Sequence, residues 1–170
     1  MTLLRVWPGL LALILSCLAM SGVAEAKRLA LVVGNGAYQH LDPLENPAND
    51  TREVADALRR LGFEVTLLTD VSPAIFAAVL DAFGAQAKGA EAALFYYAGH
   101  AFVQDGVNRL VPVTARLDRP ETLAAETWAL PDILARLDGA ETRLVFLDAC
   151  RTSPVTAGVP GVAAQGLQEF

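Results

Sequence analysis

Cysteine and histidine are scarce in this chain. Among its 170 residues are two cysteines, Cys17 and Cys150, and two histidines, His40 and His100. A structural zinc site needs four such ligands at close spacing, and these four are scattered along the chain. No acidic segment has the spacing of a calcium-binding loop. We therefore expect no metal and no cofactor.

Basic charge and aromatic side chains are also limited. The chain has 13 Lys and Arg against 19 Asp and Glu, and 7% aromatic residues. Because no basic cluster is present, we expect no nucleic-acid surface. The stretch "GNGAYQ" at 34–39 has Gln39 where a dinucleotide fingerprint needs Gly, and no phosphate-loop lysine follows, which argues against nucleotide binding. With 54% hydrophobic residues, the length suits one globular domain with a sizeable core.

The first 26 residues have the organisation of a secretory signal peptide. Arg5 precedes the apolar run "VWPGLLALILSCLAM", and small residues lead to Ala26. We predict cleavage near Ala26 and a periplasmic or secreted mature chain that does not bind membranes. The alternatives are a membrane anchor, for which the run is short, and a lipoprotein cleaved at Cys17. Cleavage near Ala26 leaves Cys150 as the single cysteine and excludes an internal disulfide.

Apolar runs and turn residues predict an α/β fold. Strands are predicted at 28–34, 63–69, 92–98 and 143–149, helices at 49–62, 72–89 and 130–137, and a hairpin at 101–113 around Asp105-Gly106. This alternation indicates a three-layer sandwich with a mostly parallel sheet and helices on both faces.

Helical periodicity also predicts which side chains face the sheet. In the first helix Val54, Ala57, Leu58 and Leu61 share one face, and in the second Ile75, Val79 and Phe83 do so.

Two strands end on residues with reactive side chains. "LFYYAGHA" ends at His100 and "LVFLDACR" ends at Cys150, both beyond the carboxyl end of a strand, where sites in parallel sheets form. If the strands are neighbours, the two side chains share one edge. An imidazole can take the proton of a thiol, and the thiolate can attack a peptide carbonyl. The backbone N–H groups of Ala101 and Cys150 are the candidate oxyanion donors.

Each residue also has a structural interpretation. A single histidine after a strand can be a hydrogen-bonded loop residue, and a single cysteine can be a small core side chain. The joint pattern favours a His100–Cys150 dyad. His40 lies in the polar stretch "YQHLDPLENP" and is expected at the surface.

The ordered set of motifs resembles the caspase-like cysteine peptidases, and most of all the bacterial caspase-homologue and metacaspase branch. The matching stretches are "RLALVVGNGAY", "LENPANDTREVADALRRLGFEV", "LFYYAGHA", "NRLVPV" and "LVFLDACR". They correspond to the family's large-subunit (p20) domain, here 27–152, and 50 residues separate His100 from Cys150, a spacing known for caspases. The resemblance implies a caspase-like fold and a cysteine endopeptidase acting on peptides or proteins.

The resemblance also implies a pocket for the side chain before the cut bond. Metacaspase relatives use acidic groups there and cut after Arg or Lys; the matching positions are Asp50 and Asp148. Asp50 could instead belong to a capping box with Glu53. Asp148 ends an apolar strand, where a charge needs a partner.

Two features depart from the family pattern. Ala101 stands where relatives usually have Gly. The family continues into a small-subunit region, whereas 153–170 here is expected to be a loop-like start of it, so a partner chain could supply that region. The alternative function is a catalytically weak or inactive caspase-like domain that acts as an interaction scaffold.

Overall fold

The computed structural model describes residues 27–149. The predicted signal peptide (1–26), Cys150 and the predicted tail (153–170) lie outside these residues, and the proposed domain boundaries stay predictions. Within 27–149, no helix combines the length and apolar character that a membrane span requires.

A parallel sheet of four strands forms the centre of the domain. The strands are β1 (Arg28–Gly34), β2 (Glu64–Thr69), β3 (Ala92–Gly99) and β7 (Thr142–Ala149), in the order β2-β1-β3-β7. The two central strands are buried along nearly their whole length, which explains why they read as continuous apolar runs. The outer strands β2 and β7 are partly exposed.

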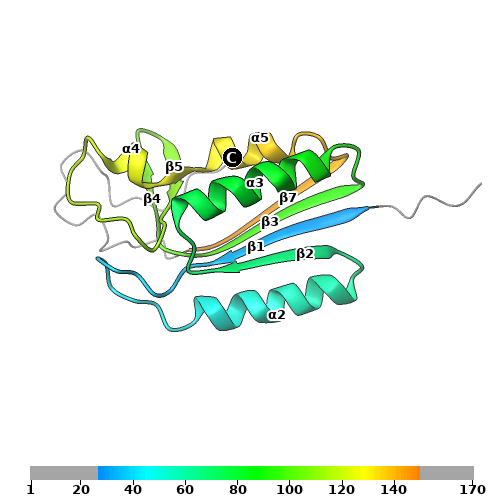
Figure 1. The fold of residues 1–170 in the computed structure, drawn as a ribbon, viewed down its shortest axis with the longest axis horizontal. Coiled ribbons are helices and arrows are strands. Elements are labelled where there is room, and N and C mark those ends of the chain that lie inside the picture. The colour runs from blue at the N-terminus through cyan, green and yellow to red at the C-terminus, as the bar shows by residue number, and fades with distance from the viewer. Residues whose placement is uncertain (1–26, 150–170) are drawn as a thin grey trace, which may run out of the picture.

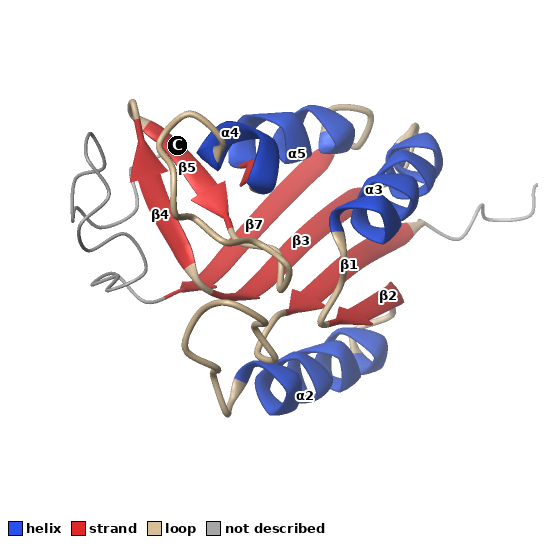
Figure 2. Ribbon diagram, turned by 60° about the vertical axis from the view of Figure 1, so that its left-hand side comes forward, coloured by secondary structure: helices blue, strands red, loops and turns tan. Residues whose placement is uncertain are grey.

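Helices cover both faces of this sheet. Figures 1 and 2 show α2 (Pro47–Arg60) on one face, and α3 (Pro73–Ala87) with α5 (Leu130–Leu137) on the other. The core under α3 and α5 includes Phe76, Phe83 and Phe95, while the core under α2 includes Leu58 and Tyr96. Burying one such side chain contributes about 1.5–3 kcal/mol. The predicted three-layer, caspase-like α/β fold is confirmed.

The helix faces differ from the predicted ones by one residue in places. Leu61 is 63% exposed because α2 ends at Arg60, so the chain has already left the helix there. Ile75 is 55% exposed, since α3 turns Phe76 toward the sheet instead. Ser72 is the N-cap of α3, and its side chain makes no capping hydrogen bond.

A small antiparallel sheet lies at the carboxyl end of the main sheet (Figure 2). The predicted hairpin forms β4 (Ala101–Gln104) and β5 (Val107–Leu110). Its turn residues Asp105 and Gly106 have φ angles of 50° and 76°, as a type I′ turn requires. Helix α4 (Leu123–Glu126) and strand β6 (Trp128–Ala129) were not predicted, because segments this short carry no periodicity.

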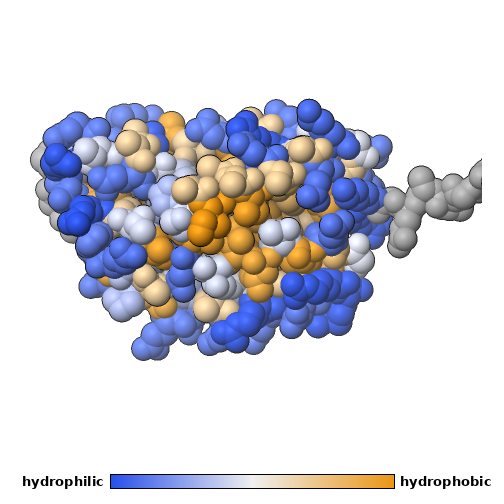
Figure 3. All heavy atoms as spheres, viewed as in Figure 1, coloured by the Kyte–Doolittle hydropathy of each residue, from blue (hydrophilic) through white to orange (hydrophobic). Residues whose placement is uncertain are grey.

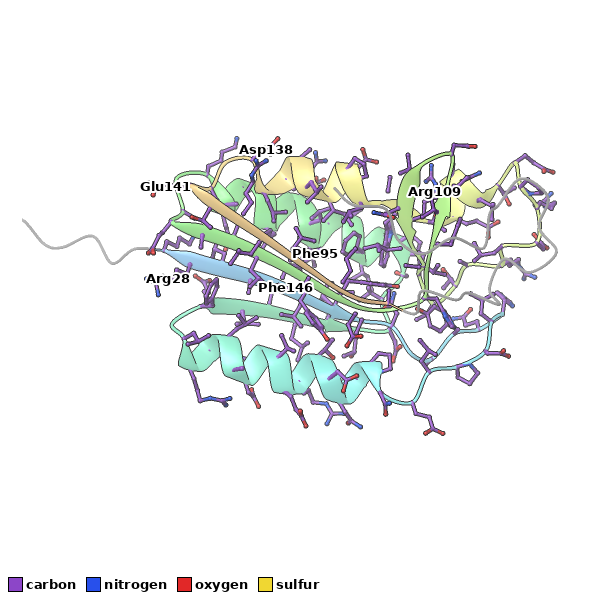
Figure 4. The ribbon with its side chains drawn as sticks, turned by 180° about the vertical axis from the view of Figure 1, so that it is seen from behind. Arg28, Phe95, Arg109, Asp138, Glu141 and Phe146 are labelled. Atoms are coloured by element: carbon purple, nitrogen blue, oxygen red, sulfur yellow. The ribbon has the colours of Figure 1, made fainter. Side chains whose placement is uncertain are left out.

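Strand β7 forms one edge of the described sheet. Phe146 is 54% exposed and points toward the α2 side, whereas Phe95 on β3 packs in the core under α3 (Figure 4). Figure 3 shows the side of the molecule opposite to the one in Figure 4. Apolar surface is visible there too, between the hydrophilic outer sides of the helix layers.

Candidate active site

The register between strands β3 and β7 explains how His100 and Cys150 can form the predicted dyad. Strands β3 and β7 are parallel neighbours, and Gly99 pairs with Ala149. His100 directly follows Gly99, and Cys150 directly follows Ala149. The two strands are thus neighbours, which is the condition that the predicted dyad requires. Cys150 itself lies outside the described residues, so its catalytic role and its oxyanion role stay predictions.

The imidazole of His100 is held in a defined tautomer. His100 is 5% exposed, and its Nε2 atom lies 2.9 Å from the backbone carbonyl oxygen of Asp42. A carbonyl can only accept a hydrogen bond, so Nε2 carries the proton and Nδ1 keeps its lone pair. The ring of Tyr38 packs against the imidazole, with centroids 4.5 Å apart. Nδ1 is therefore the basic atom.

Two buried tyrosines bind the backbone on either side of this ring. The Tyr38 hydroxyl accepts from the His100 N–H at 2.8 Å, and the Tyr97 hydroxyl donates to the His100 carbonyl at 2.9 Å. Burial raises the pKa of Tyr38 to about 12 and that of Tyr97 well above its usual range. Both phenols stay neutral near pH 7 and keep these hydrogen bonds.

Gly99 leaves room for the two hydroxyl groups. Its φ is +154°, and a Cβ atom built there would lie 2.7 Å from the hydroxyl oxygens of both Tyr38 and Tyr97. The glycine before His100 is thus required by backbone conformation and by close packing.

The loop after β1 carries Asp42 and is fixed by two polar side chains. Asn35, fully buried, donates to the Val111 carbonyl and accepts from the Val71 N–H. One carboxylate oxygen of Asp70 accepts from the N–H groups of Gly36 and Ala37, each at 2.8 Å. Because a carboxylate occupies these amides, they do not offer a phosphate cradle, which agrees with the argument against nucleotide binding.

A pocket of about 200 Å³ lies beside the histidine. Its lining residues come from the loop before α2, from the first turn of α2 and from the ends of β3 and β7: Leu44, Glu45, Asn46, Pro47, Asp50, Ala98, Gly99 and Asp148. Both predicted substrate-binding carboxylates, Asp50 and Asp148, are among them. The fold therefore brings these two acids from distant segments to one concave site, which a third acid, Glu45, also lines.

Each of the two acids has a defined setting. Helix α2 begins at Pro47, with Asn46 at the N-cap, so Asp50 lies inside the first turn. The capping-box alternative is wrong for that reason, while a favourable interaction with the helix dipole remains. The partner of Asp148 is Tyr96 of the neighbouring strand, whose hydroxyl donates to its carboxylate at 3.1 Å.

The backbone amide of Ala101 points away from the neighbouring strand β5. The Val111 N–H donates to the His100 carbonyl, which starts the β4–β5 ladder. In an antiparallel pair every second residue bonds across, so Ala101 does not donate to β5. This arrangement is compatible with the predicted oxyanion role, which stays a prediction.

Several polar residues at the site were not predicted. They are Asp42, which acts through its carbonyl, Tyr38 of the loop after β1, and Tyr96 and Tyr97 of the apolar strand β3, which act through their hydroxyls. Tyr96 lies on the same face of the sheet as Asp148, because Ala98 pairs with Asp148 and Tyr96 is two residues before Ala98. The alternation of side chains along the strand is the signal that could have found it. His40 is exposed, as expected. Among residues 27–149 no cluster of three or more His, Cys, Asp or Glu is arranged to hold a metal ion.

The three-layer fold, with a histidine after β3 and an acidic pocket beside it, defines a domain of the caspase type. The model of the caspase-domain peptidase family matches residues 27–167. This match covers most of the chain, and the protein therefore belongs to the caspase-domain family.

Known relatives agree with this assignment. The chain is 33% identical over 127 residues to mucosa-associated lymphoid tissue lymphoma translocation protein 1 of Homo sapiens and to its Mus musculus homolog. The match takes in 73% of this chain but 15% of each relative's length. A crystal structure of a Geobacter sulfurreducens protein has a TM-score of 0.55 at 23% identity, over 73% of this chain and 50% of that one, which is a likeness of fold.

Proposed function

We propose that this domain is a cysteine endopeptidase that cuts after Arg or Lys with His100 and Cys150 as its catalytic pair. The observation that carries the proposal is the β3–β7 register, which aligns the residues preceding His100 and Cys150. Family membership supports a peptidase, and its substrates are then peptides or proteins.

The tautomer of His100 assigns each proton transfer. Nδ1 takes the proton of the Cys150 thiol, and the thiolate attacks the carbonyl carbon of the substrate. The N–H groups of Ala101 and Cys150 stabilise the oxyanion. The imidazolium then protonates the leaving amine, the acyl-enzyme forms, and water activated by the same imidazole releases the acid. Asp42 keeps the ring oriented through its carbonyl.

The acidic pocket supports a cationic residue before the cut bond. Asp50 and Asp148 line a concavity that also contains Gly99, the residue before the proposed base. A guanidinium or ammonium group between two carboxylates forms charge-assisted hydrogen bonds. An acidic side chain would be repelled there.

The edge of the sheet at β7 supports the proposal that additional polypeptide packs against the domain. Phe146 is more than half exposed on this strand, and the apolar residues Val54, Leu58, Leu94 and Tyr96 line a shallow pocket with it. We propose that a small-subunit region, from further sequence or a partner chain, covers this edge in the active enzyme. The proposal includes export to the periplasm or the exterior after cleavage near Ala26.

Alkylation of Cys150 tests the dyad without any substrate. In the mature chain, iodoacetamide should modify Cys150 near pH 7 much faster than it modifies glutathione, because a histidine base raises the thiolate fraction. His100→Ala should lower this rate, whereas the matched control His40→Ala should not, since His40 is exposed and outside the pocket.

A peptide panel tests the reaction itself. We expect turnover of substrates with Arg or Lys before the cut bond and none with Asp, both abolished by Cys150→Ala. Equal alkylation rates in wild type and His100→Ala, together with no cleavage, would instead favour the scaffold function. Faster turnover of an Asp substrate would contradict the proposed specificity.

A further inference from the structure

Among residues 27–149, the carboxylate of Asp148 has a hydrogen-bond partner on the neighbouring strand. The Tyr96 hydroxyl donates to the Oδ2 atom of Asp148 at 3.1 Å, across the β3–β7 boundary. Asp148 itself is exposed at the pocket wall, whereas Tyr96 is 8% exposed. A solvent-accessible carboxylate is thus tied to a side chain that cannot move freely.

The phenol ring is immobilised by apolar packing. Tyr96 belongs to the core cluster under α2, with Val32, Leu58 and Leu94. A side chain packed in this way keeps one rotamer, so its hydroxyl is a fixed point next to Asp148. The hydrogen bond transmits this fixed position to Asp148.

The phenol also stays a donor at working pH. Burial, followed by the negative charges of Asp148 and Asp50, raises the pKa of Tyr96 above its usual range. A neutral phenol has one proton to donate, and this proton goes to Oδ2. Tyr96 therefore engages Oδ2 and not the Oδ1 atom of Asp148, and Asp50 lines the same pocket from α2.

We propose that Tyr96 is a positioning residue for the cation pocket: its hydroxyl fixes the Asp148 carboxylate in the orientation that binds the guanidinium of an arginine side chain. This inference rests on the proposed cation specificity of the pocket and assigns that specificity a supporting residue on β3. Pre-organisation lowers the cost of ordering the carboxylate when the ligand binds.

Binding of N-acetyl-arginine methylamide, followed by NMR titration, tests the proposal without catalysis. Tyr96→Phe keeps the ring and removes the hydroxyl. We expect it to weaken binding of this probe by about three- to tenfold, the range for one hydrogen bond to a charged group that is partly replaced by water. The neutral isostere N-acetyl-citrulline methylamide should bind weakly to the wild type, and Tyr96→Phe should change its affinity little.

A double-mutant cycle separates positioning from packing. In the Asp148→Asn background the additional Tyr96→Phe change should have almost no effect on the arginine probe, because no carboxylate remains to be oriented. Equal losses in both backgrounds, or unchanged affinity in the single Tyr96→Phe variant, would overturn the proposal. Thermal unfolding of each variant confirms that the fold persists.

Peptide kinetics distinguish this inference from the proposed peptidase function. For an arginine substrate, Tyr96→Phe should raise KM and leave kcat nearly unchanged, since Tyr96 does not contact the reacting atoms. Arginine binding that depends on Tyr96, in a chain that cuts no peptide, would support the inference and contradict the peptidase function. Cleavage after arginine with the same KM in both proteins would do the opposite.

Discussion

The Nε2 atom of His100 lies 2.9 Å from the carbonyl oxygen of Asp42. A backbone group of a loop, and not a side chain, therefore selects the tautomer of the proposed base. Asp42 lies in a loop that two contacts hold in place. The Asp70 carboxylate accepts from two loop amides, and Asn35, the first residue of the loop, accepts from the Val71 N–H. The base is consequently insensitive to the side chain at position 42, and depends on the network that fixes the loop and the His100 backbone.

Removal of one hydroxyl should expose this dependence. Tyr38→Phe leaves the buried N–H of His100 without the acceptor that now lies 2.8 Å away. We expect the free energy of unfolding to fall by about 1–3 kcal/mol, the cost of an unpaired buried donor. Urea denaturation measures this change. The control Ile75→Ala removes a largely exposed side chain and should stay within about 0.5 kcal/mol of wild type. Equal stability of Tyr38→Phe and wild type would contradict the network.

A pair of glycine variants should separate strain from steric conflict. Gly99→Ala places a methyl group 2.7 Å from two tyrosine hydroxyls, and should cost about 3 kcal/mol or more. Gly89→Ala also has a positive φ, +73°, but meets nothing within 4 Å, and should cost only about 1–2 kcal/mol. Thermal unfolding of both proteins tests the order. A Gly89→Ala variant that is the less stable of the two would show that packing around His100 is not tight.

Neutralising either pocket acid should weaken binding of a cationic substrate. Asp50→Asn and Asp148→Asn keep the side-chain shape, and each should raise KM for an arginine substrate by about tenfold, which corresponds to about 1.4 kcal/mol. Steady-state kinetics on arginine and citrulline peptides measure the effect, which should be confined to the arginine peptide. Asp56→Asn is the control, because Asp56 lies on the same helix, pairs with Arg59 and does not line the pocket. A KM equal to that of the wild type in both pocket variants would contradict the proposed role of these acids in substrate binding.

The contribution of Glu126 to stability should depend on pH. Burial opposes its ionisation, but the N–H groups of Arg116 and Leu117, the Thr122 side chain and the charge of Arg119 together outweigh burial and lower the pKa of Glu126 from its usual value. A carboxyl whose pKa is lower in the folded state stabilises the protein above its unfolded pKa, and this contribution is lost as the pH falls through the folded pKa.

We therefore expect Glu126→Gln to reduce the free energy of unfolding by about 0.5–1 kcal/mol at pH 7, a modest value because solvent screens the carboxylate. The difference from wild type should fade as the pH falls through the lowered pKa of Glu126, where wild-type Glu126 also becomes neutral. Denaturation at several pH values measures it, with the exposed Glu53→Gln as control. A difference that grows on acidification would have the wrong sign.

Many elements of this fold were predictable from local patterns. Continuous apolar runs marked β1 and β3, and Asp105-Gly106 marked the hairpin, because each depends on backbone preference or burial along a short segment. The helix faces were less certain: Leu61 and Ile75 were assigned to the core by periodicity, yet helix ends and rotation depend on packing against the sheet.

By itself, the sequence determined the α/β class and the position of His100 after a strand, since these follow from residue order and from the period of the side chains. The two candidate acids, Asp50 and Asp148, came from the resemblance to the caspase-like family. Tertiary structure alone decided that β3 and β7 are neighbours in a register pairing Gly99 with Ala149, that the Asp42 carbonyl meets Nε2, and that Tyr96 reaches Asp148. The physical reason is that strand order and loop closure are set by the packing of the whole core, so contacts across more than fifty residues leave no local pattern in the chain.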